Sequence, residues 1–135
     1  MKTAVIIAEC NPFHTRHARL FEAARQRGYD TVAVLLSGNY VQRGDTALFD
    51  KWTRTRALIA GGADLVAELP VCSVLTSAEQ YAENGVWLAR ALGCCDALFF
   101  GSECGDLELL DRVSRLAETG AGREAVTARL SEGKS

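Results

Sequence analysis

The fold of this chain is decided by the stretch ECNPFHTRH, residues 9–17. It follows an apolar run with the composition of a strand and opens a pattern that is typical of a helix. The first amide N–H groups of a helix lack an intrahelical acceptor, and the peptide dipoles place partial positive charge there. His14 and His17 stand three residues apart and share one helical face. Both imidazoles can then donate to one polyphosphate, which predicts a phosphate site.

Outward from this stretch, four apolar runs have the pattern of strands that are covered on both faces. They are short, rich in β-branched or aromatic residues and show little alternation. They occupy residues 3–8, 31–36, 64–69 and 96–100. Because helical segments separate them, they are expected to form a parallel sheet.

Three helical patterns lie between these runs, at residues 17–27, 51–60 and 77–92. Each ends at glycine, the residue that best accepts a left-handed helix end: Gly28, the pair Gly61 and Gly62, and Gly93. The repeated strand-helix-strand order requires right-handed crossovers. The predicted fold class is therefore α/β. We expect a Rossmann-like doubly wound sheet of about four parallel strands in the order 3-2-1-4, with flanking helices.

Two further helices are predicted after the fourth strand, at residues 106–118 and 123–132. The first has apolar residues spaced for one buried stripe: Leu107, Leu110, Val113 and Leu116. Ser102 and Glu103 precede it and are either an N-cap with its partner or contacts to a ligand. The sequence leaves both interpretations open.

Ligands of an open α/β sheet bind at the carboxyl ends of the strands, where the strand order reverses. The segments that follow the four predicted strands are residues 10–17, 37–44, 71–76 and 101–105. In the order 3-2-1-4, the first and the fourth of these face each other. Gly101 would then either let the backbone approach a nucleotide or serve as a simple turn glycine.

Composition sets the outer limits of function. The chain has 135 residues and a net charge of −2, and 48% of its residues are hydrophobic, which predicts one compact domain over residues 1–135. The pI of about 5.7 argues against holding RNA by bulk positive charge, so any RNA contact must be local. Neither a bilayer-spanning run nor a secretory signal is visible in the sequence. The expected location is cytoplasmic, away from membranes.

The five cysteines are an odd number and include the adjacent pair Cys94 and Cys95. They do not form a disulfide framework, and in a reducing compartment most are expected to be buried thiols. The alternative is a metal site made of His14 and His17 with Cys10 or Cys104. The paired CxxC motifs that indicate structural zinc are absent, so the sequence predicts no metal site.

Several polar residues follow the first two predicted strands, and each has two interpretations. Asn11 and Pro12 either aim backbone amides at phosphate or supply ordinary turn chemistry. Glu9 binds metal or ribose, or else caps a loop. Gln42 and Arg43 lie in a long loop bounded by glycine, of the kind that closes over substrate. An exposed arginine in such a loop is otherwise simply solvated.

The helical pattern at residues 51–60 carries a basic cluster of Lys51, Arg54 and Arg56. These side chains either meet tRNA phosphates or pyrophosphate, or form a solvated helix face. Trp52 and Ile59 on the same helix are expected in the core and not as a platform for base stacking.

The two histidines resemble the HxGH signature of the nucleotidyltransferase superfamily. Four other segments narrow this resemblance: SGNYVQRG at 37–44, DKWTR at 50–54, DLVAELP at 64–70 and FGSECGD at 100–106. They recur in this order in the tRNA(Met) cytidine acetate ligase family. The chain resembles that family across nearly its whole length.

The resemblance implies a ligase that uses ATP to activate acetate as acetyl-adenylate. The acetyl group would pass to N4 of the wobble cytidine of elongator tRNA(Met). ATP and Mg²⁺ are implied as cofactors, and His14 and His17 as catalytic residues that stabilise charge on the phosphates. No covalent protein nucleophile is required.

The implied contacts follow residue by residue from the same resemblance. The ATP-binding residues would be Ile7, Ala8, Glu9, Cys10, Asn11, Pro12, Phe13, His14, Thr15, Arg16, His17, Ala18, Arg19, Leu20 and Gly101. The candidate contacts to substrate or tRNA are Gln42, Arg43, Lys51 and Arg54.

Two departures from the family pattern affect these expectations. The family usually has HNGH, and here Arg16 stands in place of the glycine, where it either weakens nucleotide affinity or reaches a phosphate. Members of the family are also considerably longer than this chain, which resembles an amino-terminal fragment. We therefore expect weak nucleotide binding and no complete acetylation by this chain alone.

Two other functions are compatible with the sequence. A small-molecule adenylyltransferase of the same superfamily is supported by His14 and His17, but its downstream Ser/Thr-rich phosphate motif is not found. A non-catalytic nucleotide-binding module is supported by the missing family segments and by Arg16.

Overall fold

The computed structural model describes residues 1–102 and 104–131. The chain divides into two compact units, Met1–Phe100 and Gly101–Ser135. The expectation of one domain over residues 1–135 therefore stays a prediction. Within the described ranges, no helix is long and apolar enough to cross a membrane.

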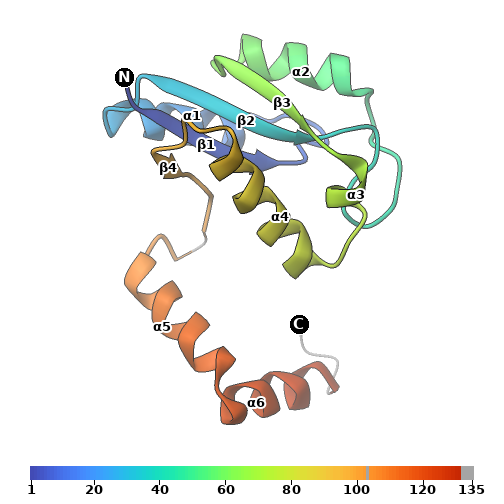
Figure 1. Ribbon diagram of the computed structural model, residues 1–135, viewed down its shortest axis with the longest axis vertical. Coiled ribbons are helices and arrows are strands. Elements are labelled where there is room, and N and C mark those ends of the chain that lie inside the picture. The colour runs from blue at the N-terminus through green and yellow to red at the C-terminus, as the bar shows by residue number, and fades with distance from the viewer. Residues whose placement is uncertain (103, 132–135) are drawn as a thin grey trace. The chain divides into compact units, whose positions relative to one another are not determined.

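The first unit is built on a parallel sheet of four strands (Figure 1). The strands are β1 Thr3–Ala8, β2 Thr31–Ser37, β3 Leu65–Leu69 and β4 Ala97–Leu98. Their order is β3-β2-β1-β4, which confirms the predicted order 3-2-1-4. The strand β4 is shorter than predicted, but the amides of Asp96 and Phe99 still donate to Thr3 and Val5 of β1 at 3.0 and 2.8 Å.

Four helices accompany this sheet. They are α1 Thr15–Gln26, α2 Lys51–Ala60, α3 Val71–Val74 and α4 Ala78–Ala91. The bounds of α2 are those predicted, whereas α1 begins two residues before its predicted start because His14 caps it. The short helix α3 was not predicted; it follows Pro70, whose fixed φ suits a helix start. Gly28, Gly62 and Gly93 follow α1, α2 and α4 with φ of 81°, 107° and 71°, as the glycine signals predicted.

Each face of the sheet carries its own apolar core, as expected for strands with little alternation. On one face, Phe21 of α1 and Leu58 of α2 pack among buried residues of β1 and β2. On the other face, Val74 of α3 and Ala89 of α4 pack with Val5 and other buried strand residues. Truncating a fully buried leucine costs about 2–5 kcal/mol, so Leu58 marks a region on which stability depends.

The expectation for the apolar residues of α2 is wrong. Trp52 and Ile59 were expected in the core, but they are 64% and 47% exposed. The side chains of α2 that turn toward the sheet are those of Arg54 and Leu58, four residues apart on one helical face. A single helix covering a sheet buries only one such face, and Trp52 and Ile59 lie outside it.

The expectation that most cysteines are buried is also wrong. Only Cys10 is buried, whereas Cys72, Cys94 and Cys104 are exposed and Cys95 is intermediate. The sequence pattern could not show this, because the exposed thiols lie in short segments at helix ends and loops rather than in strands.

The second unit contains the helices α5 Leu107–Glu118 and α6 Gly120–Ser131. Asp106, and not Ser102, caps α5, since its carboxylate accepts from the Leu109 amide at 3.1 Å. The predicted buried stripe is not found: no residue of α5 is buried, and Leu107, Val113 and Leu116 are exposed. The helix α6 begins three residues earlier than predicted. Glu103 and Glu132 lie outside the described residues.

Candidate functional site

The start of α1 is held by two imidazoles that cap each other's backbone. The Arg16 amide donates to Nδ1 of His14 at 3.2 Å, and the His14 amide donates to Nδ1 of His17 at 3.2 Å. His14 is the N-cap residue, with extended φ and ψ of −146° and 174°. This is the geometry of a capping box, with imidazoles in the places that Ser or Thr and Glu or Gln usually take.

These bonds decide where the ring protons lie. In a neutral imidazole one nitrogen accepts and the other donates, so an Nδ1 that accepts leaves the proton on Nε2. His14 and His17 therefore both present an Nε2–H donor. Their ring centroids lie 4.0 Å apart, which places the two donors within reach of one small anion.

The charge state of His17 favours this role. Partial burial and the neighbouring His14 lower the pKa of His17 below its ordinary value of 6.5. The ring stacks on Phe13, at 5.7 Å between centroids, and Phe13 in turn stacks on Phe21 at 5.9 Å. His17 is thus a neutral donor near pH 7, with its orientation fixed by aromatic packing.

The first turn of α1 adds a field that attracts anions. It contains no acidic residue, whereas Arg16 and Arg19 add exposed positive charge within the first five positions. The helix dipole places further partial positive charge at this end. Two N–H donors and an unopposed positive terminus together make an anion site suited to phosphate.

The segment before α1 is tied to the loop 38–50. Oε1 of Glu9 accepts from the Gln42 amide at 2.6 Å, and Oδ1 of Asn11 accepts from the Leu48 amide at 2.7 Å. Nε2 of Gln42 donates to the Thr76 carbonyl at 2.6 Å. Glu9 therefore caps a loop, which is the second of its two interpretations, and Asn11 fixes loop geometry. The same bonds hold Gln42 in place, while Arg43 is exposed.

Cys10 lies between these two contacts and is not suited to nucleophilic chemistry. It is buried, and burial raises the pKa of its thiol to about 11, although the charge of Arg54 opposes this rise. The thiolate is the reactive form, and it is scarce at neutral pH under these conditions. Among the described residues, no group of three His, Cys, Asp or Glu side chains lies close enough together to hold a metal ion.

The structure corrects the expectation for Arg54. It was predicted as a surface contact to substrate or tRNA, but it is 1% exposed, and its side chain donates to backbone carbonyls. It faces the sheet from α2 and cannot reach a bound tRNA. Lys51, by contrast, is partly exposed; its Nζ pairs with Oε2 of Glu68 at 2.6 Å and lies 5.4 Å from the ring centroid of Trp52.

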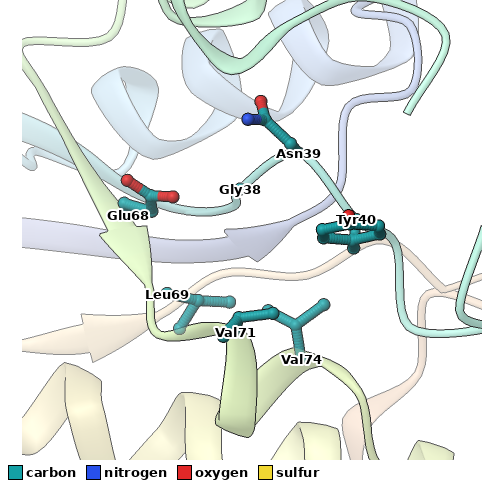
Figure 2. Close-up of a pocket in the computed structure, with 7 residues that line it drawn as sticks. All are labelled: Gly38, Asn39, Tyr40, Glu68, Leu69, Val71 and Val74. Atoms are coloured by element: carbon teal, nitrogen blue, oxygen red, sulfur yellow. The ribbon is translucent and has the colours of Figure 1, made fainter. Parts of the chain in front are cut away.

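A cavity of about 190 Å³ lies where β2 and β3 end, and Figure 2 shows the residues that line it. Leu69, Val71 and Val74 form one side of it, and the amide of Asn39 is turned away from them. Oδ1 of Asn39 accepts instead from the Lys51 amide at 3.1 Å. The lining is mainly apolar and includes no residue of the stretch 7–20, so this cavity is not the phosphate site.

The predicted nucleotide-binding stretch forms one continuous structure. Residues 7–20 comprise the end of β1, the loop that contacts residues 38–50, and the first turns of α1. Gly101 belongs to the second unit, so its place beside this stretch stays a prediction. The reasoning from sequence missed Asn39 as a residue that organises the loops, and it assigned Arg54 to substrate or tRNA instead of to the backbone carbonyls that it holds.

Comparison with known proteins gives the family of this chain. The family model for HIGH Nucleotidyl Transferase matches residues 1–135. The chain belongs to this family. In this chain, Arg16 lies between His14 and His17, the two histidines that resemble the signature of the superfamily.

Curated relatives of this chain are named tRNA(Met) cytidine acetate ligase. The protein of Acetivibrio thermocellus is 41% identical over 117 residues, which is 86% of this chain and 28% of that protein. The protein of Syntrophomonas wolfei is 40% identical over 133 residues, 96% of this chain and 32% of that protein. The chain thus spans about a third or less of the length of the relatives it matches.

A solved structure has the same fold. The crystal structure of Thermotoga maritima TmcAL bound with alpha-thio ATP matches with a TM-score of 0.82 and 33% sequence identity. The match covers 100% of this chain and 33% of that one. An α/β fold of this type in the HIGH nucleotidyl transferase family confirms the predicted fold class.

Proposed function

We propose that this chain binds the phosphates of ATP at the start of α1, as part of an enzyme that acetylates tRNA. In the proposed reaction, a carboxylate oxygen of acetate attacks the α-phosphorus of ATP and pyrophosphate leaves, which gives acetyl-adenylate. N4 of the wobble cytidine of elongator tRNA(Met) then attacks the acetyl carbon, AMP leaves, and N4 loses a proton. The names of the relatives and the ATP analogue bound to the Thermotoga protein support this proposal.

The observation that carries the proposal is the reciprocal cap of His14 and His17. Because each Nδ1 is occupied by a backbone amide, each Nε2–H is left as a donor. Negative charge on the α-phosphate oxygens increases during attack, and donors that are already oriented stabilise that charge without reorganising. The neutral state of His17 near pH 7 keeps its Nδ1 available as the acceptor that orients it.

Mg²⁺ belongs to this proposal as an ion carried by the polyphosphate. The described residues offer no carboxylate cluster for it, and Glu9 already accepts a bond from the Gln42 amide. Mg²⁺ commonly keeps several waters and binds substrate phosphates with few protein ligands, so these residues fit that mode. When bound, it would neutralise charge on the phosphates. His14, His17 and the start of α1 would orient them.

The test is a calorimetric titration of ATP with Mg²⁺ into the chain and into the double variant His14→Ser, His17→Gln. This variant rebuilds an ordinary capping box with Ser and Gln, so helix α1 keeps its cap and loses both imidazoles. We expect a thermal midpoint close to that of the parent chain and an ATP affinity that is lower by roughly tenfold or more, the equivalent of about 1.4 kcal/mol.

If the folded double variant binds ATP as tightly as the parent chain, the two imidazoles do not contact the phosphates, and this part of the proposal is wrong. A second measurement addresses the chemistry. Pyrophosphate release by the parent chain that rises with added acetate supports acetate activation, and release that acetate leaves unchanged contradicts that part of the proposal for this chain.

A further inference from the structure

Arg54 joins three backbone segments from inside the protein. Its Nε donates to the Phe49 carbonyl at 3.0 Å, its Nη1 to the Glu9 carbonyl at 2.6 Å, and its Nη2 to the Gly38 carbonyl. Glu9 follows β1, Gly38 follows β2, and Phe49 precedes α2. One guanidinium therefore links the nucleotide-binding stretch to both ends of the loop 38–50.

This arrangement is costly for the fold. Arg54 is 1% exposed, and among residues 1–102 and 104–131 no carboxylate forms an ion pair with it. Burial lowers the pKa of the guanidinium, which reflects the cost of removing its charge from water. Apolar side chains of similar volume often replace buried charges without loss of stability. An apolar residue at position 54 could not donate hydrogen bonds to these three carbonyls, whereas the guanidinium of Arg54 donates to all of them.

The bond to Glu9 sets the direction of the next peptide group. The peptide bond between Glu9 and Cys10 is trans, so its N–H points opposite to the carbonyl that Arg54 holds. The Cys10 amide has no hydrogen-bond acceptor within the described part of the chain. Cys10 also has a φ of 45°, a left-handed conformation that non-glycine residues adopt only when their surroundings impose it.

We propose that Arg54 is a positioning residue of the nucleotide site. It holds the Glu9 carbonyl and the two ends of the loop 38–50, so that the segment between β1 and α1 keeps the shape in which His14 begins the helix. It acts through the backbone and does not touch the nucleotide. This inference rests on the proposed binding of ATP at the start of α1.

The test compares ATP titrations of Arg54→Lys and Arg54→Ala with that of Arg56→Ala, an exposed arginine on the same helix. Lysine keeps the charge but cannot form the fork, so both Arg54 variants should bind ATP roughly tenfold more weakly or worse, whereas Arg56→Ala should change affinity little. Added guanidinium chloride at low, non-denaturing concentration should restore part of the affinity of Arg54→Ala. Sodium chloride at the same ionic strength should not.

Amide hydrogen exchange without nucleotide gives a readout that is independent of ATP. We expect faster exchange at residues 9–14 and 38–50 in Arg54→Lys, with protection of β1 and β2 retained. If exchange rises equally across the sheet, or if neither ATP affinity nor loop exchange changes, the inference is wrong. If Arg54→Ala does not fold, Arg54→Lys decides. If the parent chain binds no ATP, the proposed function fails, and loop exchange still decides the role of Arg54.

Discussion

Helices α1 and α4 both begin with a side chain that caps the backbone, but their first turns differ in charge. Ser77 caps α4 by accepting from the Gln80 amide at 3.2 Å, and Glu79 places a carboxylate in the first turn. At α1, the imidazoles of His14 and His17 cap the backbone, and the first turn has no acidic residue. An acidic first turn neutralises the helix dipole from within the chain. The start of α1 leaves that charge for an external anion.

One pair of side chains can therefore serve both capping and binding. Ser77 uses its single oxygen on the backbone. An imidazole has two nitrogens, so His14 and His17 use Nδ1 on the backbone and keep Nε2–H as a donor. The spacing of the two histidines is set by the capping box, in which the N-cap residue and the third helical residue pair.

The largest effect on ATP affinity is expected when the first turn of α1 receives a carboxylate, as the first turn of α4 has in Glu79. In Arg16→Glu, the charge in the first turn changes by two units. Two unit charges about 6 Å apart in water interact by about 0.7 kcal/mol, so this reversal should weaken ATP binding roughly tenfold at low salt. The helix itself should be as stable or slightly more stable, because a carboxylate suits its start. Calorimetric titration and thermal unfolding measure the two effects.

The matched control for this change is Glu79→Gln in α4. It removes a first-turn carboxylate from the other helix and should leave ATP affinity unchanged while stability falls slightly. If ATP affinity instead rises in Glu79→Gln by about half as much, in free energy, as it falls in Arg16→Glu, the effect is one of net charge in general, and the contrast between the two helix starts does not hold.

A smaller effect is expected from pH, because the pKa of His17 is lowered by burial and then by the charge of His14. Below about 6.5, the unfolded chain takes up a proton at this residue before the folded chain does. The unfolded state then binds more protons, so this residue makes stability decrease as pH falls from 6.5 through the folded pKa. Protonation also turns the Nδ1 acceptor into a donor and breaks its bond with the His14 amide.

Thermal unfolding of the parent chain and of His17→Gln between about pH 5 and about 7.5 measures this contribution. As the pH decreases, the parent chain should lose stability relative to His17→Gln. A difference that is constant across this range would show that His17 does not carry the lowered pKa.

Much of the fold could be predicted because its signals are local. The apolar runs of β1 and β2 are buried on both faces, and glycine marks the ends of α1, α2 and α4. The short helix α3 escaped prediction because four residues are too few to show a period. The stripe on α5 was predicted correctly as amphipathic, but periodicity cannot say what covers an apolar face.

The inner face of α2 was misread because hydrophobicity was taken as the sign of burial. Arg54 is buried, and Trp52 is exposed. A signal was present in the spacing, since Arg54 stands four residues before Leu58 on the same face. The reason for burying an arginine lies in the carbonyls of Glu9 and Gly38, which are distant in sequence, so no local pattern could reveal it.

The position of the two histidines at the start of a helix could be predicted, and their contacts could not. Phosphate binding, which their spacing suggests, stays a prediction. That each Nδ1 caps the backbone, that Glu9 is occupied by Gln42, and that Asn11 holds Leu48 are results of tertiary structure. Such bonds depend on how the loop 38–50 folds back, which turn residues do not specify.

The most direct test of the central claim is the ¹⁵N NMR spectrum of the two histidine rings, recorded near pH 7 without and with ATP. We expect His14 and His17 both to carry the proton on Nε2 in the free protein. ATP should then shift both Nε2 resonances and leave both Nδ1 resonances nearly unchanged. Rings protonated on Nδ1, or Nε2 resonances that do not move at saturating ATP, would contradict the claim that these two side chains cap the helix and bind phosphate together.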